Sequence, residues 1–351
     1  MVVRGYKETE IGVMPVEWES VELDDVSNTT RLAGYEYSEY WEEKEEGDIL
    51  ALKGYNIGKG KIVNRDTYYI TNKLSEQLVR SKLFIGDVVF PVVGTIGNAI
   101  TITENDKYHI NQNIAKITPS SRLNSNYLVQ FLMSFQCKKE INRFNATTSQ
   151  PNVLVGSLRK FRLPLPPLKE QEKIADILST TDDKIDAIAS QIQKAETLKK
   201  GLLQKLLSEG IGHSEFKDSE LGKIPESWEV VMINKVVNIN PNSLTNSTSA
   251  DFEIEYIDIA SIVKTGTISE TNLYKFLDAP SRARRIVNKN DVLLSTVRPY
   301  LKSFSIVKED KDNLICSTGY AVLRAKEHTY YEFIYQFILT DLFMGQVDTM
   351  L

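Results

Sequence analysis

Apolar residues follow a helical period over the longest uninterrupted stretch of the chain, between Leu168 and Glu209. They recur at alternating spacings of four and three residues, which places side chains on one stripe of an α-helix. A Pro-Leu-Pro-Pro run precedes the stretch and a Gly-Ile-Gly run follows it, so both ends carry helix-stop signals. The pattern predicts one helix over residues 168–209.

The apolar stripe has the spacing of a coiled-coil a/d seam. Its positions are Ile174, Leu178, Thr181, Ile185, Ile188, Ile192, Ala195, Lys199, Leu202 and Leu206. All of them except Thr181 and Lys199 are candidate helix-pairing residues. A long helix packs poorly along its whole length on one compact domain, so we expect a second helix to cover the seam. A plain strut between two domains is the alternative.

The segments before and after this helix are related to each other. Residues 11–19 (Ile-Gly-Val-Met-Pro-Val-Glu-Trp-Glu) return about 210 positions later as residues 221–229 (Leu-Gly-Lys-Ile-Pro-Glu-Ser-Trp-Glu). Three further pairs of segments have strand-like patterns with turns, and one pair has helical spacing. The pairs are residues 49–62 and 256–268, 85–97 and 289–301, 110–117 and 316–323, and 127–133 and 333–339.

This repeat predicts an α+β protein in which a long coiled-coil-type helix separates two tandem α+β domains. We place the first domain at residues 1–165, the spacer helix at 166–212 and the second domain at 213–351. A length of 351 residues is typical of two domains.

Charge is unevenly distributed along the chain. The net charge of −5 at first argues against a nucleic-acid partner. Residues 36–48, however, hold seven acidic side chains against one lysine, whereas residues 281–302 hold six basic side chains against Asp291 alone. Phosphate binding depends on local charge, so the overall sign decides little. No apolar leader and no run of eighteen apolar residues occur in the sequence, and we expect a cytoplasmic protein without a membrane partner.

Signatures of catalysis are absent from the sequence. Neither an Asn/Asp-Pro-Pro-Tyr/Phe methyltransferase loop nor a Gly-x4-Gly-Lys-Ser/Thr nucleotide loop occurs. The three histidines lie far apart, with no metal-ligand spacing. Cys137 and Cys316 are isolated and are expected to be buried apolar side chains. We therefore predict a protein that is not an enzyme, with no cofactor and no metal site.

Three motifs together resemble the specificity subunit of type I restriction-modification systems. They are the Ile-Gly-x-x-Pro-x-x-Trp-Glu start of each repeat, the Gly/Asn-Asp-Val-Val/Leu segment around Asp87 and Asp291, and the run Leu-Pro-Leu-Pro-Pro-Leu-Lys-Glu-Gln-Glu-Lys-Ile-Ala-Asp-Ile-Leu at residues 163–178. Each motif alone is weak, but their combination is specific. The resemblance covers the chain from Ile11 onward.

The resemblance implies a non-catalytic, sequence-specific DNA-binding subunit whose two target-recognition domains read the halves of a split double-stranded DNA target. It implies methyltransferase (M) and restriction (R) subunits as partners, docked on the helical region. The 42 residues from Leu168 to Glu209 would span about 60 Å as a helix, more than one DNA turn of roughly 34–36 Å.

The family pattern also includes a second long helix after the second domain, and we expect this C-terminal helical region to be missing here, either naturally or because the sequence is a truncated form of a longer one. We hypothesise that the helix at 168–209 pairs instead with the same helix of a second copy, as a homodimer.

Candidate DNA-binding residues are Arg and Lys, which suit guanine and phosphate, and Asn and Gln, which suit adenine. In the first domain they are Lys53, Asn56, Lys59, Lys61, Arg80, Lys82, Asn111, Gln112, Asn113 and Gln150, and in the second they are Arg282, Arg284, Arg285, Arg298 and Lys302. Hairpin turns, a linker around Gln150 and a solvated basic surface in the second domain are the structural alternatives.

Two further interpretations concern the repeated tryptophans and an alternative function. Trp18 and Trp228 occupy equivalent places, so we expect them to be core anchors rather than base-stacking residues, because readers of different half-sites should differ. The alternative function is a coiled-coil interaction scaffold without direct DNA readout.

Overall fold

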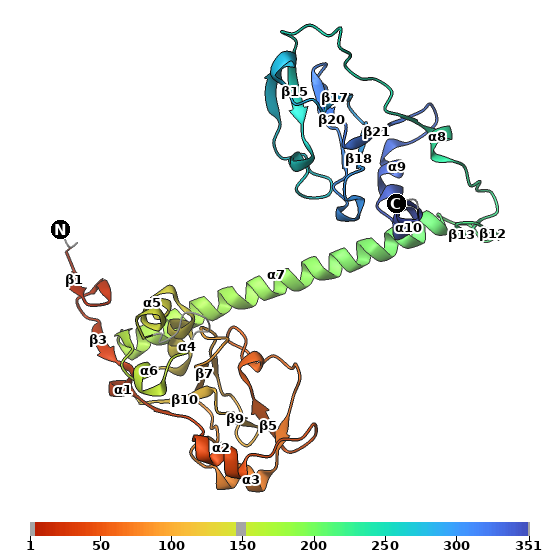
Figure 1. The fold of residues 1–351 in the computed structure, drawn as a ribbon. Helices are drawn as coiled ribbons and strands as arrows, with labels where there is room; N and C mark the ends of the chain where they lie inside the picture. Colours follow the sequence, from red (N-terminus) through yellow and green to blue (C-terminus); the bar gives the residue numbers. More distant parts are fainter. Residues whose placement is uncertain (1–3, 145–151, 350–351) are drawn as a thin grey trace. The chain divides into compact units, whose positions relative to one another are not determined.

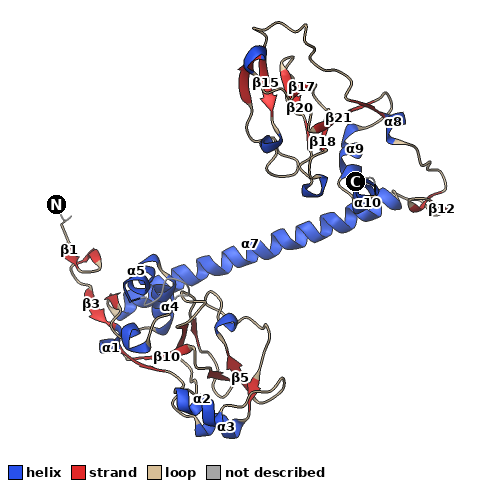
Figure 2. Cartoon of the chain, in the orientation of Figure 1, coloured by secondary structure: helices blue, strands red, loops and turns tan. Residues whose placement is uncertain are grey.

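The computed structural model describes residues 4–144 and 152–349. The chain divides into two compact units, residues 1–189 and 190–351, and the division falls inside the long helix α7 (Leu168–Ser208) (Figure 1). Both units contain helices and strands (Figure 2), which confirms the α+β fold with a long central helix. The domain boundaries at 165 and 212 stay a prediction. Among the described residues, no helix is long and apolar enough to cross a membrane.

The first unit contains two small sheets. One has the antiparallel order β4 (Ser27–Thr30), β10 (Ile114–Pro119), β7 (Val88–Pro91) and β8 (Ile100–Thr101). The other has the order β6 (Tyr69–Ile70), β5 (Ile49–Leu52) and β9 (Tyr108–Ile110), and its strands β5 and β9 are parallel. Every residue of β5 and β7 is buried, as their continuous apolar sequences require.

The first unit also contains short helices and two further strand pairs. The helices are α1 (Leu23–Val26), α2 (Gly34–Tyr40), η1 (Gly54–Asn56), α3 (Asn72–Gln77), α4 (Ser125–Met133), α5 (Phe135–Phe144) and α6 (Val155–Leu158). The pairs are the hairpin β1 (Tyr6–Thr9) with β2 (Gly12–Pro15), and β3 (Glu19–Glu22) with β11 (Arg162–Leu165). Helix α4 packs against β7 and β8 and buries Leu128 and Leu132.

The second unit repeats this plan. One sheet has the order β14 (Val237–Ile239), β21 (Tyr320–Ala325), β18 (Val292–Ser295) and β19 (Ser305–Ile306). The other has the order β16 (Asn272–Lys275), β15 (Glu253–Ile257), β20 (Leu314–Ser317) and β17 (Ala283–Ile286), with β15 and β20 parallel. The remaining elements are the hairpin β12 (Phe216–Ser219) with β13 (Gly222–Pro225), α8 (Ile233–Val236), η2 (Ile259–Ser261), η3 (Phe276–Asp278), η4 (Pro299–Leu301), α9 (Tyr331–Ile338) and α10 (Asp341–Asp348).

The sequence repeat is therefore also a structural repeat. The order β4-β10-β7-β8 matches β14-β21-β18-β19, and the parallel pair β5–β9 matches β15–β20. The sheets differ at one edge, where β17 of the second unit corresponds to a single bridge between Lys82 and His109 in the first. Strand-like residues 49–62 form only the short β5, and the chain then turns through η1.

A buried carboxylate holds the turn before the central strand in each unit. Asp87 and Asp291 are buried, and each accepts a hydrogen bond of 2.8 Å from the backbone N–H three residues earlier. In the first unit, Lys116 (Nζ to Oδ2, 3.2 Å) and the Thr118 hydroxyl (2.5 Å) complete the shell of this carboxylate. In the second, Arg324 donates two hydrogen bonds of 2.8 and 2.7 Å. Such charge-assisted bonds make a buried carboxylate tolerable.

Helix α7 is anchored to the first unit through Gln171, which is fully buried. Its Nε2 donates to the backbone oxygens of Arg122 (2.9 Å) and Pro166 (2.8 Å), and its Oε1 accepts from the Asn124 N–H (2.8 Å). The side chain thus satisfies three backbone groups at the start of the helix. Loops distant in sequence are joined to α7 at one point.

The tryptophans differ from the expectation of core anchors. Trp18 is half-buried, and its indole N–H donates to Glu170 of α7 at 3.1 Å. Trp228 is also half-buried, and its ring lies edge-on to His213 with centroids 5.9 Å apart. Both rings are thus partly exposed to solvent, and the indole N–H of Trp18 finds its polar partner at the surface.

The apolar stripe of α7 is exposed in the single chain. Ile174 packs partly against the core of the first unit, but Leu178, Ile185, Ile188 and Ile192 are 43–58% exposed, and Leu202 and Leu206 are 45% and 41% exposed. Side chains of this size are seldom left in water along a continuous stripe.

Candidate nucleic-acid interface

Three loops meet at one edge of each unit, and we call this surface the loop edge. In the first unit it consists of residues 54–61, 92–99 and 111–113. The Thr95 hydroxyl donates to Gly54 O (2.9 Å), Gly60 N to Ala99 O (3.1 Å) and Val92 N to Asn113 O (3.0 Å). In the second unit the loop edge consists of residues 259–268, 296–304 and 317–319. These loops are joined in the same way, by Thr296 N to Gly319 O (2.8 Å) and the Thr265 hydroxyl to Lys302 O (2.7 Å).

The first loop of each edge begins with the same local structure. The backbone N–H of Lys53 donates to Asn56 Oδ1 (3.0 Å), and that of Asp258 donates to the Ser261 hydroxyl (3.1 Å). Each bond closes a 3-10 turn directly after a strand, β5 in the first unit and β15 in the second. A polar side chain three residues into the turn caps it in both copies.

Close approach between loops explains one glycine at the edge. A Cβ on Gly319 would lie 2.4 Å from the Ile259 side chain, which is closer than real Cβ contacts allow. A larger residue at position 319 would force the Ile259 side chain to move, so glycine suits this close contact. The loop edge is therefore a tightly packed frame from which the remaining side chains project.

In the first unit, the frame presents Lys59 and Asn113 to solvent and leaves Gln112 half-buried. These three predicted residues come from two loops of one edge. In the second unit, Arg282 and Arg298 are exposed. They are connected to consecutive residues of the 317–319 loop, because Thr318 N donates to Arg282 O (2.9 Å) and Thr296, close to Arg298, bonds to Gly319.

Several other predicted residues of the first unit have their side chains engaged within the protein. Lys53 pairs with Glu43 (2.5 Å) and lies over the Tyr68 ring, 3.7 Å from its centroid. Burial lowers the pKa of Lys53, but the hydrogen bond and charge of Glu43 outweigh it and raise this pKa above its usual value. Asn56 is fully buried, with its amide donating to backbone oxygens. Lys61 pairs with Asp186 of α7.

Lys82 and Asn111 are buried as well. Lys82 pairs with Asp106 (2.6 Å) and Glu76 (2.5 Å), and hydrogen bonds to both carboxylates raise its pKa. Asn111 accepts from the next backbone N–H, at Gln112. Arg80 is exposed but lies after α3, outside the loop edge. Gln150 lies outside the described residues.

In the second unit, three of the five predicted cations also have internal partners. Arg284 lies over the Phe276 ring, 4.7 Å from its centroid. Arg285 is half-buried and donates to Asn240 Oδ1 (2.7 Å) and to the Tyr320 carbonyl. Lys302 donates to Leu339 O at 2.8 Å and pairs with Asp341 (3.3 Å). Arg298 is thus the predicted cation that is exposed in the loop edge of this unit, and the exposed Arg282 lies next to it, bonded to Thr318.

Two threonines at the loop edges are further candidates that the sequence pattern did not indicate. Thr95 and Thr318 are exposed at the loop edges, and hydroxyls of this kind bond either phosphate or base edges. Thr318 lies at the repeat position of Gln112, and this correspondence was the available signal for it. The residue types alone did not distinguish them from other surface threonines.

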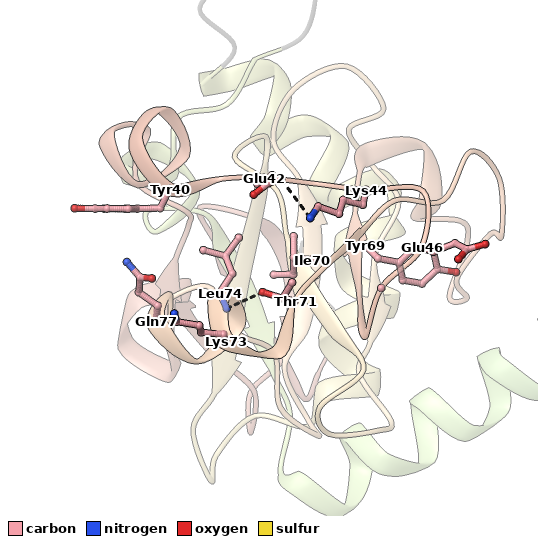
Figure 3. A pocket seen from close by; sticks show the side chains of 11 residues that line it. Tyr40, Glu42, Lys44, Glu46, Tyr69, Ile70, Thr71, Lys73, Leu74 and Gln77 are labelled. Carbon is pink, nitrogen blue, oxygen red and sulfur yellow. Dashed lines mark hydrogen bonds and ion pairs between the residues drawn. The ribbon is translucent and has the colours of Figure 1, made fainter.

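A small cavity of the first unit lies away from the loop edge. It measures about 140 Å³ and lies between α2, β6 and α3 (Figure 3). Its rim mixes charges of both signs, with Glu42 pairing with Lys44 at 3.4 Å and Glu46 and Lys73 also on the wall. A rim of mixed sign creates no field that favours phosphate.

The described residues contain no group of three or more His, Cys, Asp or Glu side chains arranged to hold a metal ion. Cys137 and Cys316 are both buried, as expected, and burial raises the pKa of each thiol to about 12. His109 is buried against Trp41, with ring centroids 5.6 Å apart, and burial lowers its pKa below the usual value.

Comparisons with known proteins agree with this architecture. The MjaX protein of Methanocaldococcus jannaschii, named as a candidate type I restriction enzyme specificity subunit, is 30% identical over 233 residues, or 64% of this chain and 54% of that protein. The EcoBI specificity subunit of Escherichia coli is 25% identical over 320 residues, 84% of this chain and 63% of that protein. The chain thus spans about half to two thirds of the length of these relatives.

Among solved structures, the S subunit of a type I restriction-modification system from M. genitalium shares the fold, with a TM-score of 0.53 at 15% identity over 94% of this chain and 79% of that one. The family model described as "Type I restriction modification DNA specificity domain" matches residues 15–197, more than half of the 351 residues. The chain belongs to this family of type I restriction-modification DNA specificity domains.

Proposed function

We propose that this chain is the DNA-recognition subunit of a type I restriction-modification complex, in which each unit reads one half of a split double-stranded target. The observation that carries the proposal is the loop edge. Both units build it from equivalent loops and similar hydrogen bonds, yet the exposed side chains differ between the copies. A constant frame with variable side chains suits two readers of two different sequences.

Within this proposal, Lys59, Gln112 and Asn113 contact DNA from the first unit, and Arg282 and Arg298 contact it from the second. Gln and Asn suit bidentate contact with adenine, and Arg suits guanine or phosphate. The predicted residues with buried or paired side chains support the loops instead. Those residues are Lys53, Asn56, Lys61, Lys82, Asn111, Arg284, Arg285 and Lys302.

In this proposal, partner subunits catalyse the methylation and cleavage of DNA. In this assignment the chain contributes recognition only, an M subunit transfers the methyl group and an R subunit cuts unmethylated DNA. Helix α7 then acts as the spacer between the readers and as a docking surface.

The decisive experiment is co-purification with the cognate methyltransferase, followed by mapping of methylated sites. We expect two short sequence blocks at a fixed gap. Arg298→Ala should relax the specificity of one block only and Asn113→Ala that of the other, by about 1–3 kcal/mol of discrimination at the affected base. Lys308→Ala, at an exposed lysine outside the loop edges, is the matched control. If both variants methylate the same two sequence blocks with unchanged specificity, the assignment is refuted.

Salt dependence separates this function from a scaffold that never touches DNA. Each phosphate that the protein neutralises should add about −0.9 to the slope of log affinity against log salt. Duplex binding by the complex that is absent or independent of salt would favour the coiled-coil scaffold, for which the exposed stripe of α7 is the supporting observation.

We also propose that α7 pairs with the same helix of a second chain. The stripe from Leu178 to Leu206 supports this pairing because it is apolar, regular and exposed. Light scattering of the purified chain at micromolar concentration should give a dimer, and Ile188→Glu should give a monomer, whereas Lys194→Glu on the same helix should not. A monomer in the unmodified chain would contradict the pairing without affecting the DNA assignment.

A further inference from the structure

The 3-10 turn η1 places an exposed aromatic ring in the loop edge of the first unit. The ring belongs to Tyr55, the middle residue of Gly54–Asn56, and it is 39% exposed. All residues of this loop edge are described by the structure, and its other large apolar side chains are buried or half-buried. Tyr55 is therefore the apolar group that this mostly polar edge presents to a ligand.

Both neighbours of Tyr55 hold its backbone in place. Gly54 O accepts from the Thr95 hydroxyl at 2.9 Å, and a Cβ on Gly54 would lie 2.9 Å from the same hydroxyl oxygen. Asn56 is fully buried, and its amide donates to the backbone oxygens of residues 63 (3.1 Å) and 65 (2.7 Å). The turn is thus fixed on one side by the 92–99 loop and on the other by the segment that follows it.

The hydroxyl of Tyr55 already has an acceptor within the protein. It donates to Asp66 O at 3.0 Å, which fixes the outer end of the ring. A phenol has a single donor, so this bond leaves none for a phosphate oxygen or for an acceptor on a base. What Tyr55 still offers to a ligand is the apolar ring. A ring held at both ends also loses little side-chain freedom when a ligand covers it.

The second unit has the same turn with a different apex. Ser261 of η2 caps its turn as Asn56 caps η1, so Ala260 is the counterpart of Tyr55. Ala260 is exposed, but its methyl group extends much less far from the backbone than a phenol ring does. The two units share the frame and differ in the apolar group that the frame presents.

We propose that the Tyr55 ring packs against the C5-methyl group of a thymine in the half-site that the first unit reads. In the major groove this methyl is the apolar group of the base edges, whereas the other distinguishing groups are hydrogen-bond donors and acceptors. Lys59, Gln112 and Asn113 of the same loop edge supply the polar contacts around it. The inference rests on the proposed function of the loop edge and adds one base identity to it.

The test uses the full chain co-purified with its cognate methyltransferase, and the target found by mapping methylated sites. The block read by the first unit is the one whose discrimination falls in Asn113→Ala. Duplexes with deoxyuridine in place of each thymidine of this block lack one methyl group each. At one position, the unmodified complex should bind the deoxyuridine duplex about fourfold more weakly, the factor that corresponds to burial of one methyl group.

Three variants identify the side chain that contacts this methyl group. Tyr55→Ala should bind the thymidine duplex more weakly and should no longer distinguish it from the deoxyuridine duplex. Tyr55→Phe keeps the ring and should keep the fourfold difference. Tyr35→Ala, at a 61% exposed tyrosine of α2 outside the loop edge, is the matched control and should keep both the affinity and the difference. All three should discriminate the second block normally, which checks that the complex is folded.

Two results would overturn the inference and leave the proposed function standing. One is a complex that recognises both blocks but has no A·T pair, or no deoxyuridine penalty, in the first block. The other is a deoxyuridine penalty that Tyr55→Ala leaves unchanged, because another side chain would then contact the methyl group. If this variant also reduces the dependence of affinity on salt, Tyr55 contacts a phosphate instead. A complex that recognises no sequence at all would refute the proposed function itself.

Discussion

Replacing Gln171 by Met should detach the start of α7 from the first unit. The side chain is fully buried and makes three hydrogen bonds of 2.8–2.9 Å to backbone groups. Met has a similar shape but satisfies none of those groups. At about 1 kcal/mol for each lost bond, the free energy of unfolding of the first unit should fall by about 3 kcal/mol. With a urea dependence of about 2 kcal/mol per molar, its midpoint should drop by about 1.5 M.

Pulsed hydrogen exchange during urea unfolding is the suitable assay, because it follows the two units separately. The second unit serves as an internal control and should keep its midpoint. Glu172→Met, at the exposed neighbouring position, is the matched variant and should shift the first unit by less than about 0.5 kcal/mol. A shift below about 0.5 M for Gln171→Met, or an equal shift in both units, would refute the anchoring role.

Three further predictions concern buried groups. Asp291→Ala leaves the Arg324 guanidinium without its buried partner and should destabilise the second unit by about 3–5 kcal/mol in the same assay; an effect confined to the first unit would contradict it. Both cysteines should resist a thiol reagent in the native protein at pH 8 and react only on unfolding, because burial raises their pKa to about 12; rapid native labelling would count against it. Burial lowers the pKa of His109 in the folded chain, so as the pH falls the unfolded chain takes up this proton before the folded chain does. The free energy of unfolding should therefore fall as the pH drops below about 6.5. His109→Gln should reduce this decline, and His328→Gln, at an exposed histidine, should not.

The sequence predicted the long helix almost to the residue, because periodic apolar spacing and proline and glycine stops are local signals. Residues 168–209 were expected and α7 spans Leu168–Ser208. The repeat was also readable, since equivalent segments became equivalent strands in both units. The α+β class followed from these two observations.

The candidate site was less predictable because exposure depends on partners remote in sequence. Arg285 looked like a surface cation, but Asn240 and Tyr320 hold it from 45 and 35 residues away. Lys82 is held by Asp106 and Glu76. Residue type reports what a side chain can bond, whereas only the fold determines whether it is already bonded.

The buried carboxylates of the two units limit how the halves of this protein can exchange parts. Lys116 and Thr118 stabilise Asp87 from β10, whereas Arg324 alone stabilises Asp291 from β21. A hybrid that placed β10 beside β18 would bring both Lys116 and Thr118 to the Asp291 carboxylate. A hybrid that carried only one of these two residues, or that lost Arg324 without gaining them, would leave the buried carboxylate with too few partners. Evolutionary shuffling of this chain should therefore preserve whole strands or whole units, with crossovers in the exposed middle of α7, where no buried pair is broken.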